Sequence, residues 1–300
     1  MHKKNEIKAY LAGIIFAVLI GFSFLGVKIS VSHATSNYIM AYRFDFAFVA
    51  MLIFWLITGE RLSFKGRSRK KILGVGFFYS AFMLLQVVGL SYATSIEAAI
   101  IFAAAPIFVV ILATIFLKEK STFIQTVFVL VVIVALGVMA VLNAGNISFN
   151  PKATFILIIS TICMASYTVL IRGLRDEYHP GEISSITIIF GFVTFNVWMI
   201  IDSIGMHSID TYLHGFSLPS LMGATAYLGV FCVLISTMLI GYMSKHLSSV
   251  VISVMGNIST SISIVVGAVI LNEPIYTFQI ICTLVIIAGI VGVAKTGKEN

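Results

Sequence analysis

Residues 123–142 read FIQTVFVLVVIVALGVMAVL, a run of 20 residues without a single charged side chain. An α-helix needs about 20 mostly apolar residues to cross the hydrocarbon core of a bilayer. The run is continuous and does not alternate between apolar and polar residues, which excludes a strand of a transmembrane β-barrel. The stretch therefore predicts a membrane-spanning helix.

The rest of the 300-residue chain has the same character, with 59% hydrophobic residues, 10% charged residues and a mean hydropathy of +1.07. Soluble domains are about 45–50% apolar and about 25% charged, so the excess apolar surface of this chain has to face lipid. The sequence predicts an all-α integral membrane protein with ten transmembrane helices. The ten runs are 8–30, 37–58, 71–92, 95–117, 123–142, 153–173, 182–204, 219–242, 248–271 and 275–294.

The basic residues gather in alternate gaps between these runs. If the N-terminus is cytoplasmic, 16 of the 19 Lys and Arg residues lie on the cytoplasmic side, and only Lys28 and Lys152 lie outside. This bias predicts a protein of the cytoplasmic membrane with both termini in the cytoplasm. The net charge of +7 therefore follows from membrane orientation and does not indicate a nucleic acid partner.

The two halves of the chain, 1–150 and 151–300, resemble each other. Residues 115–119 (IFLKE) match residues 269–273 (VILNE) at an offset of 154. Five helices per half is an odd number, so the two halves are expected to have opposite orientations in the membrane. Inverted repeats of this kind place the substrate path at their interface, near the midplane of the bilayer.

Four stretches carry a family resemblance: Gly21–Lys28 (GFSFLGVK), Ala41–Phe44 (AYRF), Leu90–Glu119 around Pro106, and Val251–Pro274. Together they resemble the drug/metabolite transporter superfamily and, within it, the EamA-type ten-helix carriers. This family usually has Trp at the position of Phe22 and often has Pro at the position of Thr260, so the two halves are not expected to bend alike. The resemblance implies a secondary transporter that exports or exchanges small metabolites, often amino acids.

Two ionisable side chains lie inside the second run. Arg43 is about 9 Å from its outer end, where an arginine needs a partner, water or reach to the headgroups. It either attracts an anionic group such as a substrate carboxylate or braces the packing of helices. Asp45 points elsewhere, because residues i and i+2 do not share a helix face. It needs another partner, such as Lys28, or stays protonated as a candidate proton carrier.

A group of polar and aromatic side chains from both halves lies at similar depth and outlines a candidate pocket for a small organic solute. Individually, each of them fits a structural role better than a ligand-binding one, and only the group as a whole indicates a pocket. Pro106 is predicted to bend its helix beside the pocket, because it has no N–H for the carbonyl of Phe102. The candidate substrate-binding residues are Ser23, Tyr79, Gln86, Phe102, Pro106, Ser166, Tyr167, Tyr227, Ser253 and Asn257.

Other functions fit the sequence less well. It has no His-Glu-x-x-His motif and no phosphate-binding glycine loop, so neither an enzymatic activity nor a metal or other cofactor is expected. Cys163, Cys232 and Cys282 lie in apolar runs and are predicted to be buried, inert thiols. A pore, disfavoured because no ring of like charges is evident, and a non-transporting scaffold remain as alternatives. The expected partners are lipid and a small-molecule substrate, with the chain a monomer or homodimer; the sequence does not specify substrate, direction or coupling ion.

Overall fold

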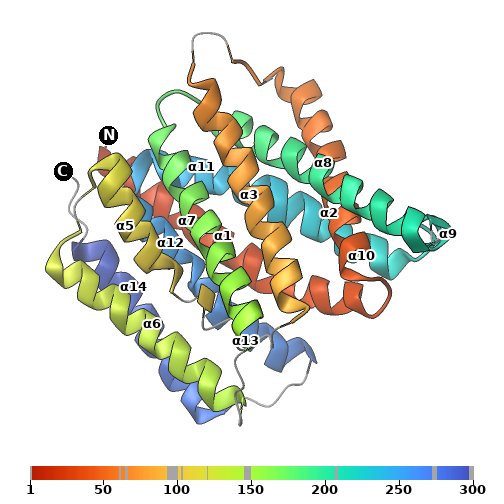
Figure 1. The fold of residues 1–300 in the computed structure, drawn as a ribbon. Helices are drawn as coiled ribbons and strands as arrows, with labels where there is room; N and C mark the ends of the chain where they lie inside the picture. Colours follow the sequence, from red (N-terminus) through yellow and green to blue (C-terminus); the bar gives the residue numbers. More distant parts are fainter. Residues whose placement is uncertain are drawn as a thin grey trace.

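The protein was analysed as a computed structural model that describes residues 2–60, 62–64, 67–92, 101–102, 104–119, 121–144, 150–206, 209–271 and 276–296. Within these ranges all regular secondary structure is helical (Figure 1). The helices are α1 His2–Val31, α2 Ser36–Thr58, α3 Arg69–Leu90, α5 Ala105–Leu117, α6 Phe123–Ala144, α7 Pro151–Gly173, α8 Pro180–Met206, α9 Ile209–Gly215, α10 Pro219–Gly229, the π-helix η1 Val230–Ile235, α11 Ser236–His246, α12 Ser249–Gly256, α13 Ile258–Leu271 and α14 Thr277–Thr296.

Six segments of the described chain are long and apolar enough to cross a membrane. They are Asn5–Val31, Ser36–Thr58, Arg69–Leu90, Pro151–Gly173, Pro180–Ile204 and Pro219–His246. The last of these joins α10, η1 and α11 into one continuous segment, as the run at 219–242 predicts. Shorter apolar helices occur within α5, α6 and α14. The composition of the chain is therefore matched by helices of membrane-spanning length.

The helices end where the sequence places turn chemistry. Gly59 ends α2 in the left-handed region, at φ +71°, and its N–H donates to the carbonyl of Trp55. The Asn150 side chain caps α7 by accepting from the Lys152 N–H at 3.0 Å. Pro219 lies in the first turn of α10, where a missing N–H costs no helical hydrogen bond.

The tightest packing joins helices of the first half to helices of the second. α3 packs on α7, α6 on α14, and α1 on α13. In Figure 1, α6 and α14 run side by side along one edge of the bundle, and α1 passes through its middle. The three cysteines are buried and free, as predicted. Neither half of the chain therefore forms a separate core.

One end of the bundle carries the start of α1 and the end of α14, and we call it the inner end; the opposite end is the outer end. Lys118 ends α5 at the inner end in the left-handed conformation, at φ 58°. The next residue, Glu119, accepts from Arg172 Nε at 2.9 Å with one carboxylate oxygen and from the Ser249 N–H at 3.2 Å with the other. Arg172 also donates to the Ser244 carbonyl. This network joins the ends of α5, α7, α11 and α12.

A second polar network at the inner end joins the loop before α3 to the start of α8. Arg67 Nη1 lies 2.6 Å from a carboxylate oxygen of the buried Glu182, which also accepts from the Ser63 N–H at 3.2 Å. The guanidinium group of Arg67 lies 5.1 Å from the centre of the Tyr178 ring. Both networks connect elements that are far apart in the sequence, and both do so with ion pairs.

Candidate functional site

The segment predicted as span four is interrupted near its middle. Ile101 and Phe102 are helical, Ala104 is in a turn, and α5 begins only at Ala105. Pro106 lies in the first turn of α5, where its missing N–H does not break a helical hydrogen bond. The structure therefore differs from the expected bend within one helix, because Pro106 starts a helix after an interruption.

The segment predicted as span nine is interrupted as well. α12 ends at Gly256, Asn257 is in a turn, and α13 begins at Ile258. The Asn257 Nδ2 atom is buried and has no hydrogen-bond partner among the described residues. Both segments are therefore interrupted, although Thr260 replaces a proline in the second; the expectation that the two halves do not bend alike stays a prediction. An asparagine can end a helix through its side chain, which competes for backbone hydrogen bonds.

Three of the predicted site residues lie in one aromatic group between α3 and α7. The ring centres of Tyr79 and Tyr167 are 4.9 Å apart. Phe82 is 6.1 Å from Tyr79 and also 6.1 Å from Phe102, both in edge-to-face geometry. The ring of Phe44 on α2 is 6.4 Å from that of Tyr79. The structure thus brings Tyr79, Phe102 and Tyr167 together through rings that were not singled out from the sequence.

A second group of predicted residues lies between α1 and α10. The Tyr227 hydroxyl donates to the Leu19 carbonyl at 2.9 Å, and the Cys232 thiol donates to the same oxygen at 3.4 Å. Ser23, one helical turn after Leu19, donates to the carbonyl of Ile20 at 2.6 Å. Tyr227 and Ser23 are therefore neighbours on packed helices, and both hydroxyl groups are engaged with the backbone.

Arg43 adjoins both groups. The ring of Phe44, the next residue of α2, is 6.4 Å from that of Tyr79 in the first group, and α2 packs on α10, which carries Tyr227 of the second. The backbone of α2 is held close to α10 here, because a Cβ atom at Gly229 would overlap the Arg43 carbonyl oxygen. The Arg43 Nε atom is buried and donates to no acceptor among the described residues.

Asp45 has two partners that the sequence did not identify. The Asn196 amide donates to one carboxylate oxygen at 2.7 Å, and the Tyr212 hydroxyl donates to the other at 2.5 Å. These partners replace the pairing with Lys28 considered from the sequence. Tyr212 belongs to the short helix α9, and both burial and the bond to Asp45 raise the pKa of its phenol well above the ordinary value. Tyr212 therefore remains a proton donor at physiological pH.

The structure says less about the role of the remaining candidate substrate-binding residues. The Ser166 hydroxyl donates to the carbonyl of Ile162 in its own helix at 2.8 Å, which fits a structural role. Gln86 and Ser253 are half-buried, on α3 and α12 respectively, without a hydrogen bond to another described side chain. The prediction that Gln86 and Asn257 contact a common cavity stays a prediction.

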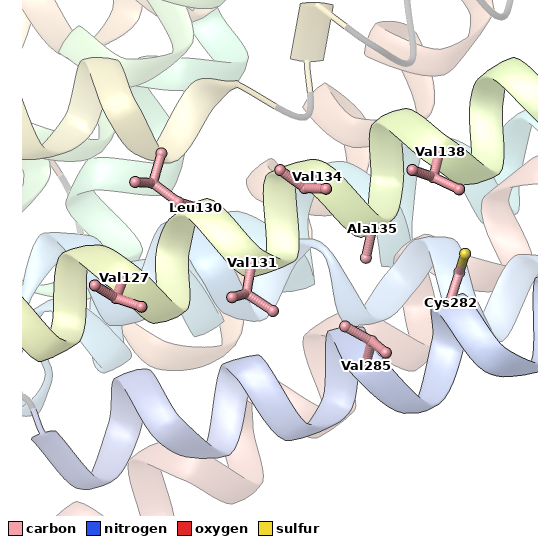
Figure 2. A pocket seen from close by; sticks show the side chains of 8 residues that line it. All are labelled: Val127, Leu130, Val131, Val134, Ala135, Val138, Cys282 and Val285. Carbon is pink, nitrogen blue, oxygen red and sulfur yellow. The ribbon is translucent and has the colours of Figure 1, made fainter.

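A groove of about 410 Å³ lies away from all of these residues. Figure 2 shows it between α6 and α14, with valine side chains of both helices turned toward it and no polar group on its walls. A wall without polar groups offers nothing to orient a metabolite, so the candidate site is the region around Arg43. The lining residues are Val127, Leu130, Val131, Val134, Ala135, Val138, Cys282 and Val285.

Comparison with known proteins identifies the family. The model of the EamA-like transporter family matches the chain twice, over residues 7–141 and 151–295. The chain belongs to the EamA-like transporter family. This EamA-like protein is therefore a multi-pass membrane protein of a transporter family, as the resemblance of its motifs indicates.

Relatives of this EamA-like protein carry names of the same kind. The "Uncharacterized transporter YcxC" of Bacillus subtilis is 31% identical over 294 residues, covering 97% of this chain and 94% of that protein. An "Uncharacterized transporter" of Archaeoglobus fulgidus is 26% identical over 211 residues, covering 70% and 71% of the two chains. A solved structure has a TM-score of 0.74 at 15% identity and covers 95% of this chain and 96% of its own, which shows a shared fold.

Proposed function

We propose that this protein is a secondary transporter that moves a small organic metabolite, an amino acid or a similar solute, across the cytoplasmic membrane as an exporter or exchanger. The observation that carries the proposal is the pair of helix interruptions, one before α5 and one between α12 and α13. Paired interruptions in corresponding segments of two repeats are typical of solute sites at the bilayer midplane. α5 and α12 also pack against each other, which brings the two interruptions into one region.

The packing of the helices supports ten spans arranged as two inverted repeats, 1–150 and 151–300. α5 and α13 end at Leu117 and Leu271, which the motif offset of 154 relates to each other. The contacts between the halves also occur in exchanged pairs. α3 packs on α7 and α8, while α10 packs on α1 and α2; α5 packs on α7, while α13 packs on α1. A two-fold relation between the halves accounts for these pairs.

The inner end supports an alternating-access mechanism. The network of Glu119 and Arg172 joins four helix ends from both halves, so it forms a barrier that has to open for a solute to pass. Cytoplasmic termini place this barrier at the cytoplasmic face. A reporter that is active only in the cytoplasm, fused after Asn300, tests this orientation; activity only outside the cell contradicts it.

The transport function is tested by screening cells that overexpress the protein for export of small metabolites, followed by counterflow assays in proteoliposomes. Pro106→Ala restores the missing N–H and favours a continuous helix, and Asn257→Leu has the same aim in the other half. Both variants are expected to fold and to transport more slowly. Pro219→Ala is the matched control, because this proline also begins a helix but lies at the end of a span. If both test variants transport at the wild-type rate, the helix interruptions are not needed for transport.

A further inference from the structure

Arg43 lies in a part of α2 that is mostly covered by protein, and its own side chain is partly exposed. Three neighbours one turn away are almost inaccessible, since Ile39 is 5% exposed, Met40 6% and Ala47 0%, and the fourth, Phe46, is half-buried. The exposed apolar side chains of α2 lie further along, from Val49 onward. Arg43 is therefore separate from the most exposed apolar part of α2, and its buried Nε atom has no acceptor among the described residues.

No acidic side chain neutralises Arg43 among the described residues. It takes part in none of their ion pairs. Asp45 has both carboxylate oxygens engaged by neutral donors, and Asp202 accepts from the Asn37 amide at 2.5 Å. An arginine inside a membrane protein without a counter-charge is a functional site by default, because the protein itself does not offset the desolvation of the charge.

The surroundings of Arg43 are suited to a ligand with one charged end. The Tyr79 hydroxyl and the Cys232 thiol are the polar groups on which its charge acts. The rings of Tyr79, Tyr167 and Phe44 provide a continuous aromatic wall beside them. A planar guanidinium group offers two parallel N–H donors to the two oxygens of a carboxylate, and an aromatic wall packs against an apolar body.

We propose that Arg43 binds the carboxylate of the transported solute, and that this solute is a small monocarboxylate with an apolar or aromatic body. The proposal rests on the transport function proposed above and specifies its site. In this arrangement the solute supplies the negative charge that none of the described residues supplies to Arg43, and we expect the Tyr79 hydroxyl to donate to the same carboxylate. Tyr167 contacts the body of the solute and not its charge.

The test uses the full-length protein purified in detergent and a panel of monocarboxylates, each paired with its uncharged amide; phenylacetate with phenylacetamide and butyrate with butyramide are two such pairs. Affinity is measured from the ligand-dependent rise in Tm. The wild-type protein is expected to bind the acids about 10- to 100-fold more tightly than the amides, the range for a hydrogen-bonded charge. Arg43→Gln should remove that preference, and Arg43→Lys, which keeps the charge but loses the fork, should reduce it.

One control keeps the outcome specific. Arg175→Gln changes a partly exposed arginine at the inner end and should leave the preference unchanged. Equal binding of acids and amides by the wild-type protein, no binding of any acid, or a preference that survives in Arg43→Gln overturns the proposal. If Arg43→Gln does not fold, an undiminished preference in Arg43→Lys decides against it.

Counterflow in proteoliposomes separates this proposal from the transport function. If the protein moves neutral solutes but no carboxylate, the role of Arg43 is wrong and transport stands. If Arg43→Gln loses the movement of acids and keeps that of neutral solutes, both proposals are supported. If the wild-type protein moves neither class, the transport function itself fails.

Discussion

The inner and outer ends of the bundle are held together by different chemistry. At the inner end, Arg172 pairs with Glu119 and Arg67 pairs with Glu182, so charged side chains of both signs join the helix ends. At the outer end, Asp45 accepts from an amide and a phenol, and Asp202 accepts from the Asn37 amide. The contacts described at the inner end are thus ion pairs, and those described at the outer end are hydrogen bonds from neutral donors to carboxylates.

Rings packed on rings accompany the outer contacts, whereas in the inner networks described above the ring of Tyr178 packs against the guanidinium group of Arg67. The rings of Tyr42 and Tyr212 are stacked at 4.5 Å, and Phe216 meets both rings edge to face at 5.1 and 5.5 Å. Separating the outer end therefore exposes apolar rings to water. Separating the inner end exposes charges that water solvates well, so hydration recovers much of the lost attraction. We infer that the inner end opens more readily than the outer end, because opening brings both partners of each ion pair into contact with water.

The largest effect is expected from removing one partner of the inner pair. In Arg172→Ala, the Glu119 carboxylate still accepts from Ser249, the first residue of α12, but it loses its ion pair with Arg172. The Ser244 carbonyl loses a hydrogen-bond donor as well. Loss of one partner of a buried pair costs about 3–5 kcal/mol, and the Arg172 side chain is only 10% exposed. Thermal unfolding of the detergent-purified protein should show a large fall in Tm.

Arg175→Ala is the matched control for this prediction. It lies three residues further along the chain and pairs with Asp176, whose side chain is 87% exposed. Exposed pairs contribute about 0–1 kcal/mol, so the Tm should barely change. Equal losses in the two variants would show that the Glu119 network is not what closes the inner end.

A smaller effect is expected at the outer end from Tyr212→Phe. This change keeps the ring stacked on Tyr42 and removes only the hydroxyl that donates to Asp45. A hydrogen bond to a charged group contributes about 1.5–3 kcal/mol, so the variant should lose less stability than Arg172→Ala. Asp210→Asn on the same short helix, at an exposed position, is the control and should be neutral. A loss as large as that of Arg172→Ala would show that the Tyr212 hydroxyl contributes more than one hydrogen bond to a charged group.

The sequence predicted the helices well because lipid imposes a strong constraint on composition. Runs of about 20 apolar residues are needed wherever a helix crosses a bilayer, and turn residues such as Gly59 and Pro219 mark where they end. The interruption at Asn257 escaped prediction because an asparagine within an apolar run does not oblige a helix to stop. Its effect depends on what the side chain and the neighbouring backbone contact in the fold.

The candidate site was only partly predictable. Tyr79 and Tyr167 were selected by side-chain type and depth and Phe102 by its carbonyl near Pro106, and the structure places the three rings in one aromatic group. The partners of Asp45 were missed because they are more than 150 residues away in the sequence. Tyr212 lies in the short helix α9, within a gap between two predicted spans that offers no periodic signal, so pairing across such a distance is visible only once the halves are packed.

The smallest effect is expected from Glu177, in the loop between α7 and α8 at the inner end. Hydrogen bonds from the Ser68 N–H, at 2.9 Å, and from the Ser68 hydroxyl, at 3.1 Å, lower the pKa of its carboxyl from the ordinary value of 4.5. A carboxyl whose pKa is lower in the folded protein stabilises the fold above the unfolded pKa and loses that contribution as the pH falls through the folded pKa. Glu177→Gln should therefore have a slightly lower Tm than the wild-type protein at about pH 6, and the difference should vanish by about pH 3. If the difference in Tm stays constant between these pH values, the effect of Glu177→Gln is due to packing. The charge of Glu177 then does not help to hold the inner end together.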